Sequence, residues 1–365
     1  GPEVEYSRDS VAYHPETGEK IPANTPVYVE FDEGRKGSLM VEGTVNYNPD
    51  PFLEDIDNFN LAFFHGGGGY LEQVPAVIYG DAAVKMVCTA AGALRLYHKS
   101  PTETFTEGET VTTSIILKTL KALNLRDVNF GLRKVGGVSV GVMSGSNLGI
   151  QEIAENIYKI TATFTVNSTT AAAAGIQFFN CEVGDYFIID ALQAERKAYP
   201  TPIHDGTRAN PAKQITLTAP LPSTFGIGLS AKMLHAHDTA DRTFWQAGDY
   251  RCYFDAADNK IKMTNGVVVA QTAVVWAAED IVGIYAGRDD TMGNLFVQAK
   301  IAGAVTERAE VAGDAIDSGT NLYVGSKADG SESVNAVVAD FVLHDRPEDI
   351  DPEGYLSAIP GGGGE

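Results

Sequence analysis

Cysteine, positive charge and long apolar runs are scarce in this chain of 365 residues, and each scarcity excludes a class of protein. Its only cysteines are Cys88, Cys181 and Cys252, and none belongs to a CxxC pair. We therefore expect buried, reduced thiols rather than a disulfide framework or a zinc site, which fits synthesis in a reducing cytoplasm. No segment approaches the roughly 20 apolar residues of a membrane helix. The N-terminal GPEVEYSRDS lacks the basic region and the apolar core of a signal peptide, so none is expected.

Basic residues are outnumbered, with 27 lysines and arginines against 48 aspartates and glutamates, which gives a net charge of −21. A field of this sign repels nucleic acids and anionic membranes, so we expect no nucleic-acid partner and no membrane insertion. Solubility of a large surface accounts for such a charge. The alternative interpretation is cation binding by local clusters of carboxylates.

Motifs of catalysis are missing as well. The glycine-rich HGGGGY at 65–70 lacks the GK[ST] that completes a phosphate loop. Neither GxSxG nor HExxH occurs. The HAHD segment offers His235, His237 and Asp238, with Asp241 nearby, as metal ligands, but a polar loop between two strands is the favoured interpretation. We therefore expect a protein that is not an enzyme. A polysaccharide-active enzyme stays as the third hypothesis, because an acidic chain offers many pairs of carboxylates.

What the sequence does contain is alternation of apolar and polar residues with period two. Residues 49–200 show it in runs about ten residues apart, with Gly, Asn and Ser between them, and 213–345 repeat it. Two segments, 117–127 and 169–175, are rich in helix formers but lack caps, so strand or loop is predicted, with a short helix left open for the first. The predicted fold is all-β, with an extended N-terminal arm followed by two antiparallel β-sandwich (jelly-roll) domains.

Composition divides the chain further. Residues 1–48 have many turn formers and few alternations, which indicates an arm that must lie on its own body or on a neighbouring subunit. The predicted organisation is an arm at 1–48, a first sandwich at 49–204, a linker at 205–212, a second sandwich at 213–346 and a tail at 347–365.

Particular segments resemble known families. The first sandwich resembles the galactose-binding-like jelly rolls of carbohydrate-binding modules, and the second resembles concanavalin-like domains of the laminin-G type. The segments that carry the first likeness are NPDPFLEDIDNFN (48–60), IYKITATFTVN (157–167) and YFIIDALQAERKAYPT (186–201). Those that carry the second are RTFWQAGDYRCYFD (242–255), TAVVWAAEDIVGIYAG (272–287), TNLYVGSKADGSE (320–332) and NAVVADFVLHDRPEDIDPEGYLSAI (335–359). The seam ALQAE…AYPTP…GTRA resembles the junction between two such folds in head-appendage and tail proteins of tailed phages.

This resemblance implies a virion structural protein: a head fibre, a decoration protein or a tail adhesin. It would be made in the host cytoplasm and lie on the virion surface, with capsid or tail proteins and host glycans as partners. A homo-oligomer, such as a trimer, would gain avidity from repeated weak sites. The alternative is a purely structural capsid decoration or tail component that binds no glycan.

Candidate site residues are few. Aromatic rings stack on sugars, so Trp245, Tyr250, Tyr253 and Tyr97 are the candidates for ligand binding, although the same rings at period two can fill a core. The jelly-roll resemblance implies a structural Ca²⁺ where the opening loop meets the last strand, with Glu54 and Asp190 at the matching positions.

Overall fold

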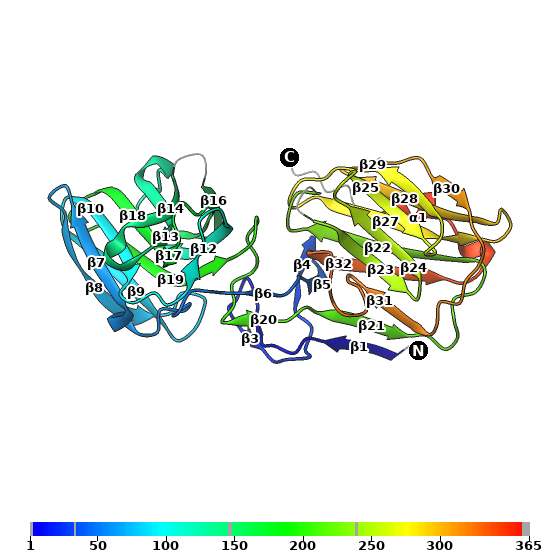
Figure 1. Ribbon diagram of the computed structural model, residues 1–365, viewed down its shortest axis with the longest axis horizontal. Helices are drawn as coiled ribbons and strands as arrows, with labels where there is room; N and C mark the ends of the chain where they lie inside the picture. Colours follow the sequence, from blue (N-terminus) through cyan, green and yellow to red (C-terminus); the bar gives the residue numbers. More distant parts are fainter. Residues whose placement is uncertain (1–2, 33, 145–147, 238–239, 360–365) are drawn as a thin grey trace. The chain divides into compact units, whose positions relative to one another are not determined.

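Two compact units make up the chain in the computed structural model, which describes residues 3–32, 34–144, 148–237 and 240–359 (Figure 1). We call residues 12–20 and 44–208 the middle unit, and residues 1–11, 21–43 and 209–365 the C-terminal unit. Each unit includes a part of the N-terminal segment: residues 12–20 belong to the middle unit, and residues 21–43 to the C-terminal unit.

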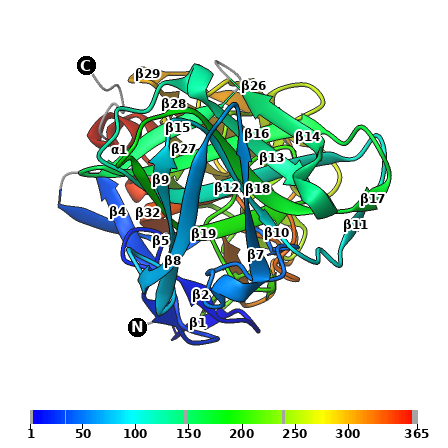
Figure 2. The same ribbon diagram turned by 90° about the vertical axis from the view of Figure 1, so that its left-hand side faces the viewer.

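The middle unit is a sandwich of two antiparallel sheets with two-stranded pairs at its margin (Figure 2). The five-stranded sheet has the order β14 (Ser139–Ser144), β13 (Val128–Arg133), β18 (Ala173–Cys181), β10 (Gly92–His98) and β7 (Phe59–Phe64). The six-stranded sheet has the order β15 (Gly149–Ala154), β16 (Ile157–Thr165), β12 (Thr110–Lys118), β19 (Tyr186–Glu195), β9 (Ala82–Ala90) and β8 (Gly68–Pro75). The small pairs are β11 (Thr104–Phe105) with β17 (Thr170–Ala171), β2 (Ala12–Tyr13) with β3 (Lys20–Ile21), and β20 (Thr207–Arg208) with β6 (Thr44–Val45).

The C-terminal unit has the same architecture with larger sheets. Its seven-stranded sheet has the order β1 (Glu3–Ser7), β21 (Ala212–Thr216), β31 (Asn321–Val324), β23 (Arg242–Ala247), β24 (Tyr250–Asp255), β25 (Lys260–Thr264) and β26 (Val269–Ala273). Its second sheet has the order β29 (Ala304–Val305), β28 (Asn294–Ile301), β27 (Ile281–Asp289), β22 (Phe225–Met233), β32 (Ala336–His344), β5 (Arg35–Met40) and β4 (Tyr28–Asp32), with β30 (Ala309–Ala312) on β28.

The alternation of apolar and polar residues along the strands explains how each unit forms its buried core. In the middle unit the inward residues of both sheets, such as Leu94, Phe130 and Ile189, form one buried apolar cluster. The C-terminal unit has a separate cluster that includes Trp245 and Ile284. Burial of one face of each sheet is the main stabilising contribution in such sandwiches. The predicted all-β class with two antiparallel sandwiches is confirmed.

In the expected arm at 1–48, the described strands pair with other strands of the same chain. Strand β1 pairs with β21, with Glu3 opposite Thr216, and β5 pairs with β32, with Leu39 opposite Val337. Residues 12–20 instead lie on the middle unit, where the hydroxyl of Tyr79 donates to the carbonyl oxygen of Pro15 at 2.9 Å. The arm thus supplies strands to one sandwich and a hairpin to the other.

Helices are few and short in the described ranges. They are η1 (Ile56–Asn58), η2 (Leu125–Asp127), η3 (Val135–Gly137), η6 (Pro347–Asp349) and α1 (Pro352–Ala358). The α1 helix begins after Asp351, whose carboxylate accepts a hydrogen bond from the amide of Gly354 at 2.9 Å. No helix within these ranges has the length and apolar character needed to cross a membrane.

Candidate functional site

The outward face of the five-stranded sheet in the middle unit carries the most distinctive polar group of the chain. On β10, Leu94 and Leu96 point into the core, so Arg95 and Tyr97 lie on the opposite face. Figure 2 shows β7, β10 and β18 side by side in this sheet. Both outward side chains are half-buried. The candidate site is built around them.

Strand register brings the other members to the same face. Gln177 on β18 lies between Arg95 on β10 and Asn129 on β13, because it is opposite both. Tyr97 lies opposite Asn60 on β7. Opposite residues in antiparallel strands share a face, so these five side chains are neighbours. We call this surface the outer face.

The side chain of Arg95 is held in place by three residues: Gln177, Gly137 and Phe64. Its Nε and Nη2 atoms both donate to Oε1 of Gln177, at 2.9 and 2.7 Å. Its Nη1 donates to the carbonyl oxygen of Gly137 at 2.9 Å. The guanidinium carbon is 4.1 Å from the ring centroid of Phe64, a cation–π contact. The side chain is therefore preorganised, with one edge of its guanidinium committed to a neutral amide.

Arg133 lies on the same face, on β13, with β18 between it and Arg95, and only 2% of its surface is exposed. Its Nη1 donates to the same Gly137 oxygen at 3.2 Å, and its Nη2 donates to Oδ1 of Asn129 at 2.8 Å. Gly175 provides the space, because a Cβ there would lie 2.9 Å from Cδ of Arg133. Burial, with a contribution from the neighbouring Arg95, lowers the pKa of Arg133 to about 9. Burial also lowers the pKa of Arg95.

The tight turn η3 (Val135–Gly137) covers part of the outer face. Gly136 and Gly137 have φ of +82° and +74°, which favours glycine. A Cβ on Gly137 would lie 2.9 Å from Cδ1 of Tyr97, so the turn rests directly on that ring. The outer face thus presents aromatic rings, a guanidinium and amides in fixed positions. Such groups can stack on a sugar ring and form hydrogen bonds with its hydroxyls.

The four aromatic candidates have different environments. Trp245 and Tyr250 are buried in the C-terminal core, with 0% and 1% of their surface exposed. A stacking platform has to be accessible, so the prediction of a ligand role is corrected for these two: they are core residues. Tyr253 is half-buried beside Arg251, whose guanidinium carbon lies 4.1 Å from its ring centroid. Tyr97 belongs to the outer face.

The two residues suggested for calcium both lie against the loop at 76–81. Asp190 is fully buried and accepts hydrogen bonds from the amides of Val77, Ile78 and Tyr79, at 2.6 to 2.9 Å. Burial raises the pKa of Asp190, and these three donors oppose that shift. Glu54 is exposed, and its Oε1 lies 3.1 Å from the position of a Cβ on Gly80. Asp190 therefore anchors a loop, and calcium at these residues stays a prediction.

The loop that opens the middle unit, which contains Pro51, contacts the long strand β19: the amide of Leu192 donates to the carbonyl oxygen of Pro51 at 2.8 Å. Within the described part of the chain, no three side chains of His, Cys, Asp or Glu gather as a metal-binding group.

The HAHD histidines have structural contacts around one indole. Nε1 of Trp276 donates to the carbonyl oxygen of His235 at 2.9 Å, and Nδ1 of His237 lies 2.9 Å from the carbonyl oxygen of Trp276. Asp238 lies outside the described residues. Asp241 accepts a hydrogen bond from the amide of Ala256 at 3.0 Å.

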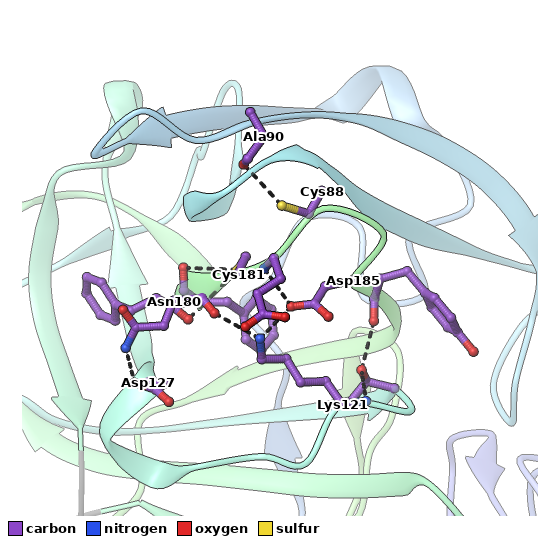
Figure 3. A network of polar contacts seen from close by, with 12 residues as sticks. Cys88, Ala90, Lys121, Asp127, Asn180, Cys181 and Asp185 are labelled. Atoms are coloured by element: carbon purple, nitrogen blue, oxygen red, sulfur yellow. Dashed lines mark hydrogen bonds and ion pairs between the residues drawn. The ribbon is translucent and has the colours of Figure 1, made fainter.

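Another polar cluster closes the turn between β18 and β19 (Figure 3). The ammonium of Lys121 donates to the carbonyl oxygen of Asn180 at 2.8 Å and to the carboxylate of Asp185 at 2.5 Å. Cys88 and Cys181 lie at this turn, and both are free and buried, as is Cys252. Burial raises the pKa of Cys181 to about 11 and raises that of Cys88. These thiols are therefore structural, because a nucleophilic cysteine needs a lowered pKa.

Tyr97 was among the ligand residues proposed from the sequence, and Arg95, Arg133 and Gln177 were not. A signal was present in the strand sequences GALRLYH and VNFGLR, which each hold one arginine among apolar residues and no acidic residue. Only the strand register shows that the two arginines lie on one face.

No known protein family matches this chain, and no curated protein matches it. Similar solved structures include domains LG4-5 of the mouse laminin alpha1 chain, with 9% identity, a TM-score of 0.25, and coverage of 77% of this chain and 89% of that one. A tandem of CBM22 domains from Paenibacillus barcinonensis has 10% identity and a TM-score of 0.25, with coverage of 86% and 100%. A tail fibre protein of an Escherichia coli phage has 10% identity and a TM-score of 0.24, with coverage of 83% of this chain and 40% of that one. At such scores these likenesses carry no argument about what this chain binds.

Proposed function

We propose that this chain is a non-enzymatic adhesion protein of a virion surface and that it binds host glycans on the outer face of the middle unit. The observation that carries glycan binding is the geometry of that face. Tyr97 and Phe64 offer aromatic rings, while Arg95, Gln177 and Asn129 offer fixed donors and acceptors. A few oriented polar groups beside aromatic surface are the usual composition of a carbohydrate site.

The virion setting rests on the sequence of the seam at 191–209, which resembles junctions in phage structural proteins. In this proposal the capsid or tail is the attachment partner, and several copies of the chain act together, because repeated weak sites gain avidity. Electron microscopy of particles that carry a labelled copy tests the location directly.

Glycan binding is tested with an array of bacterial surface glycans and the full chain. We expect selective binding that Tyr97→Ala weakens about tenfold, the loss expected when one stacking ring is removed. Leu120→Ala is the matched control, because Leu120 is 67% exposed and follows β12 of the other sheet. Equal binding by Tyr97→Ala and the wild type would place the site elsewhere.

The alternative function is a structural particle component that binds no glycan. Deletion of a whole unit is a poor test, because β1, β4 and β5 from the N-terminal segment belong to the C-terminal unit. Tyr97 is half-buried on the outer face, so we expect Tyr97→Ala to keep the fold while it removes the proposed stacking ring. Tyr97→Ala particles that assemble but fail to bind the host favour adhesion, whereas a wild-type chain that binds no glycan and is still required for particle assembly favours the structural role.

A further inference from the structure

Positive charge on the outer face is not neutralised by its own sheet. The five strands contain no aspartate or glutamate, and Arg95 and Arg133 are their only lysines or arginines. This occurs in a chain with 48 acidic residues and a net charge of −21. None of the ion pairs found among the described residues includes either arginine.

Two other stacked arginines of the chain differ from Arg95 in this respect. Arg251, on the seven-stranded sheet, lies over Tyr253 at 4.1 Å, the same distance as Arg95 over Phe64. Arg251, however, forms an ion pair with Glu332. Arg196 of the middle unit likewise pairs with Glu103, at 2.6 Å. Arg251 and Arg196 thus each combine stacking on a ring with an ion pair, whereas Arg95 has none among the described residues, and neither has the more distantly stacked Arg8, at 5.7 Å from the ring centroid of Tyr6.

The two guanidinium groups also converge. Both donate to one neutral acceptor, the carbonyl oxygen of Gly137, at 2.9 and 3.2 Å. Nε of Arg133 has no hydrogen-bond acceptor in the described structure, although only 2% of the surface of this residue is exposed. Two like charges that share one carbonyl repel each other, and a buried cation without a counterion is costly. An anion bound at this point would relieve both penalties.

We propose that the Arg95–Arg133 pair is a subsite for the anionic group of an acidic sugar, a carboxylate or a sulfate. This inference rests on the proposed function, because it names the glycan class that the outer face takes. Arg95, half-buried over the ring of Phe64, contacts the anion, and the more deeply buried Arg133 supplies the second charge. A planar guanidinium suits the paired oxygens of such a group. The aromatic ring of Tyr97, two residues further along β10 and on the same face, then contacts the sugar ring.

The first test needs no known glycan. Thermal unfolding of the full chain is measured in sodium D-glucuronate, in sodium sulfate, and in glucose with sodium chloride, all at equal ionic strength. Ligands that bind only the folded chain raise its midpoint. We expect glucuronate, sulfate or both to raise the midpoint of the middle unit relative to glucose, and Arg95→Gln to abolish that increment. Sulfate also stabilises folded proteins in general, and this effect is the same in the wild type and in Arg95→Gln. The difference between the two midpoints therefore reports binding at Arg95.

Arg251→Gln is the matched control, since it removes a stacked arginine from the other unit, and it should keep the full response to the anions. Arg95→Lys keeps the charge without the planar fork, so its response should be intermediate. Arg133→Gln is a second test of the pair. If Arg133→Gln does not fold, because its position is buried, Arg95→Gln still tests the subsite.

The second test is the glycan array with the same variants. We expect acidic glycans to bind, and we expect Arg95→Gln to weaken their binding about tenfold. Comparison of carboxylated with sulfated glycans on the array shows which of the two anionic groups the subsite binds. Binding of neutral glycans that Arg95→Gln leaves unchanged would overturn the anionic subsite and leave glycan adhesion standing. An anion response without binding of any glycan would support the subsite and overturn adhesion. If wild type and Arg95→Gln respond equally to every anion, the subsite is refuted.

Discussion

Glu195 and Thr201 are joined by a hydrogen bond of 2.5 Å between Oε1 and Oγ1, in a part of the middle unit that solvent does not reach. The same carboxylate accepts from the amide of Thr201 at 3.1 Å and from Nε2 of Gln193 at 2.7 Å. Oε1 of Gln193 in turn accepts from the amide of His204 at 3.0 Å. The seam that follows β19 is therefore fixed by a buried polar network.

Replacement of Glu195 by alanine should lower the free energy of unfolding by about 2–3 kcal/mol, because two buried donors on Thr201 and one on Gln193 would lose their acceptor. Urea unfolding followed by fluorescence measures this loss. The control is Glu155→Ala, since Glu155 is an exposed turn residue of the same unit, and it should change stability by less than about 0.5 kcal/mol. Equal stability of the two variants would show that the network contributes nothing.

His204 should make the middle unit sensitive to mild acid. Burial, with a contribution from Arg208, lowers the pKa of His204 from 6.5 to about 3. The unfolded chain therefore binds a proton before the folded chain does as the pH falls. The stability that neutral His204 provides is complete above pH 6.5 and is lost between 6.5 and about 3, at roughly 1.4 kcal/mol per pH unit.

The measurement is the unfolding free energy of His204→Gln and of the wild type from about pH 7 to 5, above the range in which most carboxylates titrate. The variant should show a flatter acid slope. His65→Gln, a substitution at an exposed position of the same unit, is the control and should keep the wild-type slope. Parallel slopes for His204→Gln and the wild type would contradict the assignment.

The sandwiches could be predicted because their signal is local. Period-two alternation indicated the strands, and the alanine-rich 169–175 forms β17 and the start of β18, as its context suggested. The pairing of β1 and β5 with strands of the C-terminal unit was not predictable in this way. The partners Leu39 and Val337 are far apart in sequence, and no local pattern identifies which sheet edge an extended segment joins.

The candidate site shows the same limit. Alternation predicts that residues share a face but does not fully specify which face is buried. In β23 the register shifts between Thr243 and Trp245, so Phe244 and Trp245 are both buried and the alternation fails where the ligand role was assigned. Arg133 could be interpreted only once its burial and its contact with Gly137 were known.

The three cysteines should resist modification while the chain is folded. Burial raises the pKa of Cys88, Cys181 and Cys252, so the thiolate is scarce and shielded. With a disulfide reagent near pH 8, we expect the native chain to react at least about a hundredfold more slowly than the chain in denaturant, which should titrate three thiols. A native thiol that reacts at the denatured rate would refute the structural role.

Gly18 should be required for the hairpin at 12–20 to lie on the middle unit. Its φ is +68°, and a Cβ would lie 1.8 Å from the carbonyl oxygen of Ile78. Gly108, in the same unit, has φ of +90° and nothing within 4 Å of the Cβ position. Gly108→Ala therefore introduces backbone strain alone, about 1–2 kcal/mol. Gly18→Ala also introduces a steric overlap, which lowers the free energy of unfolding by roughly 1–3 kcal/mol more or detaches the hairpin from the middle unit. Urea unfolding compares the two, and limited proteolysis should cut the Gly18→Ala chain within 12–20. Similar losses in both variants, with the hairpin still protected, would show that this close approach is not required.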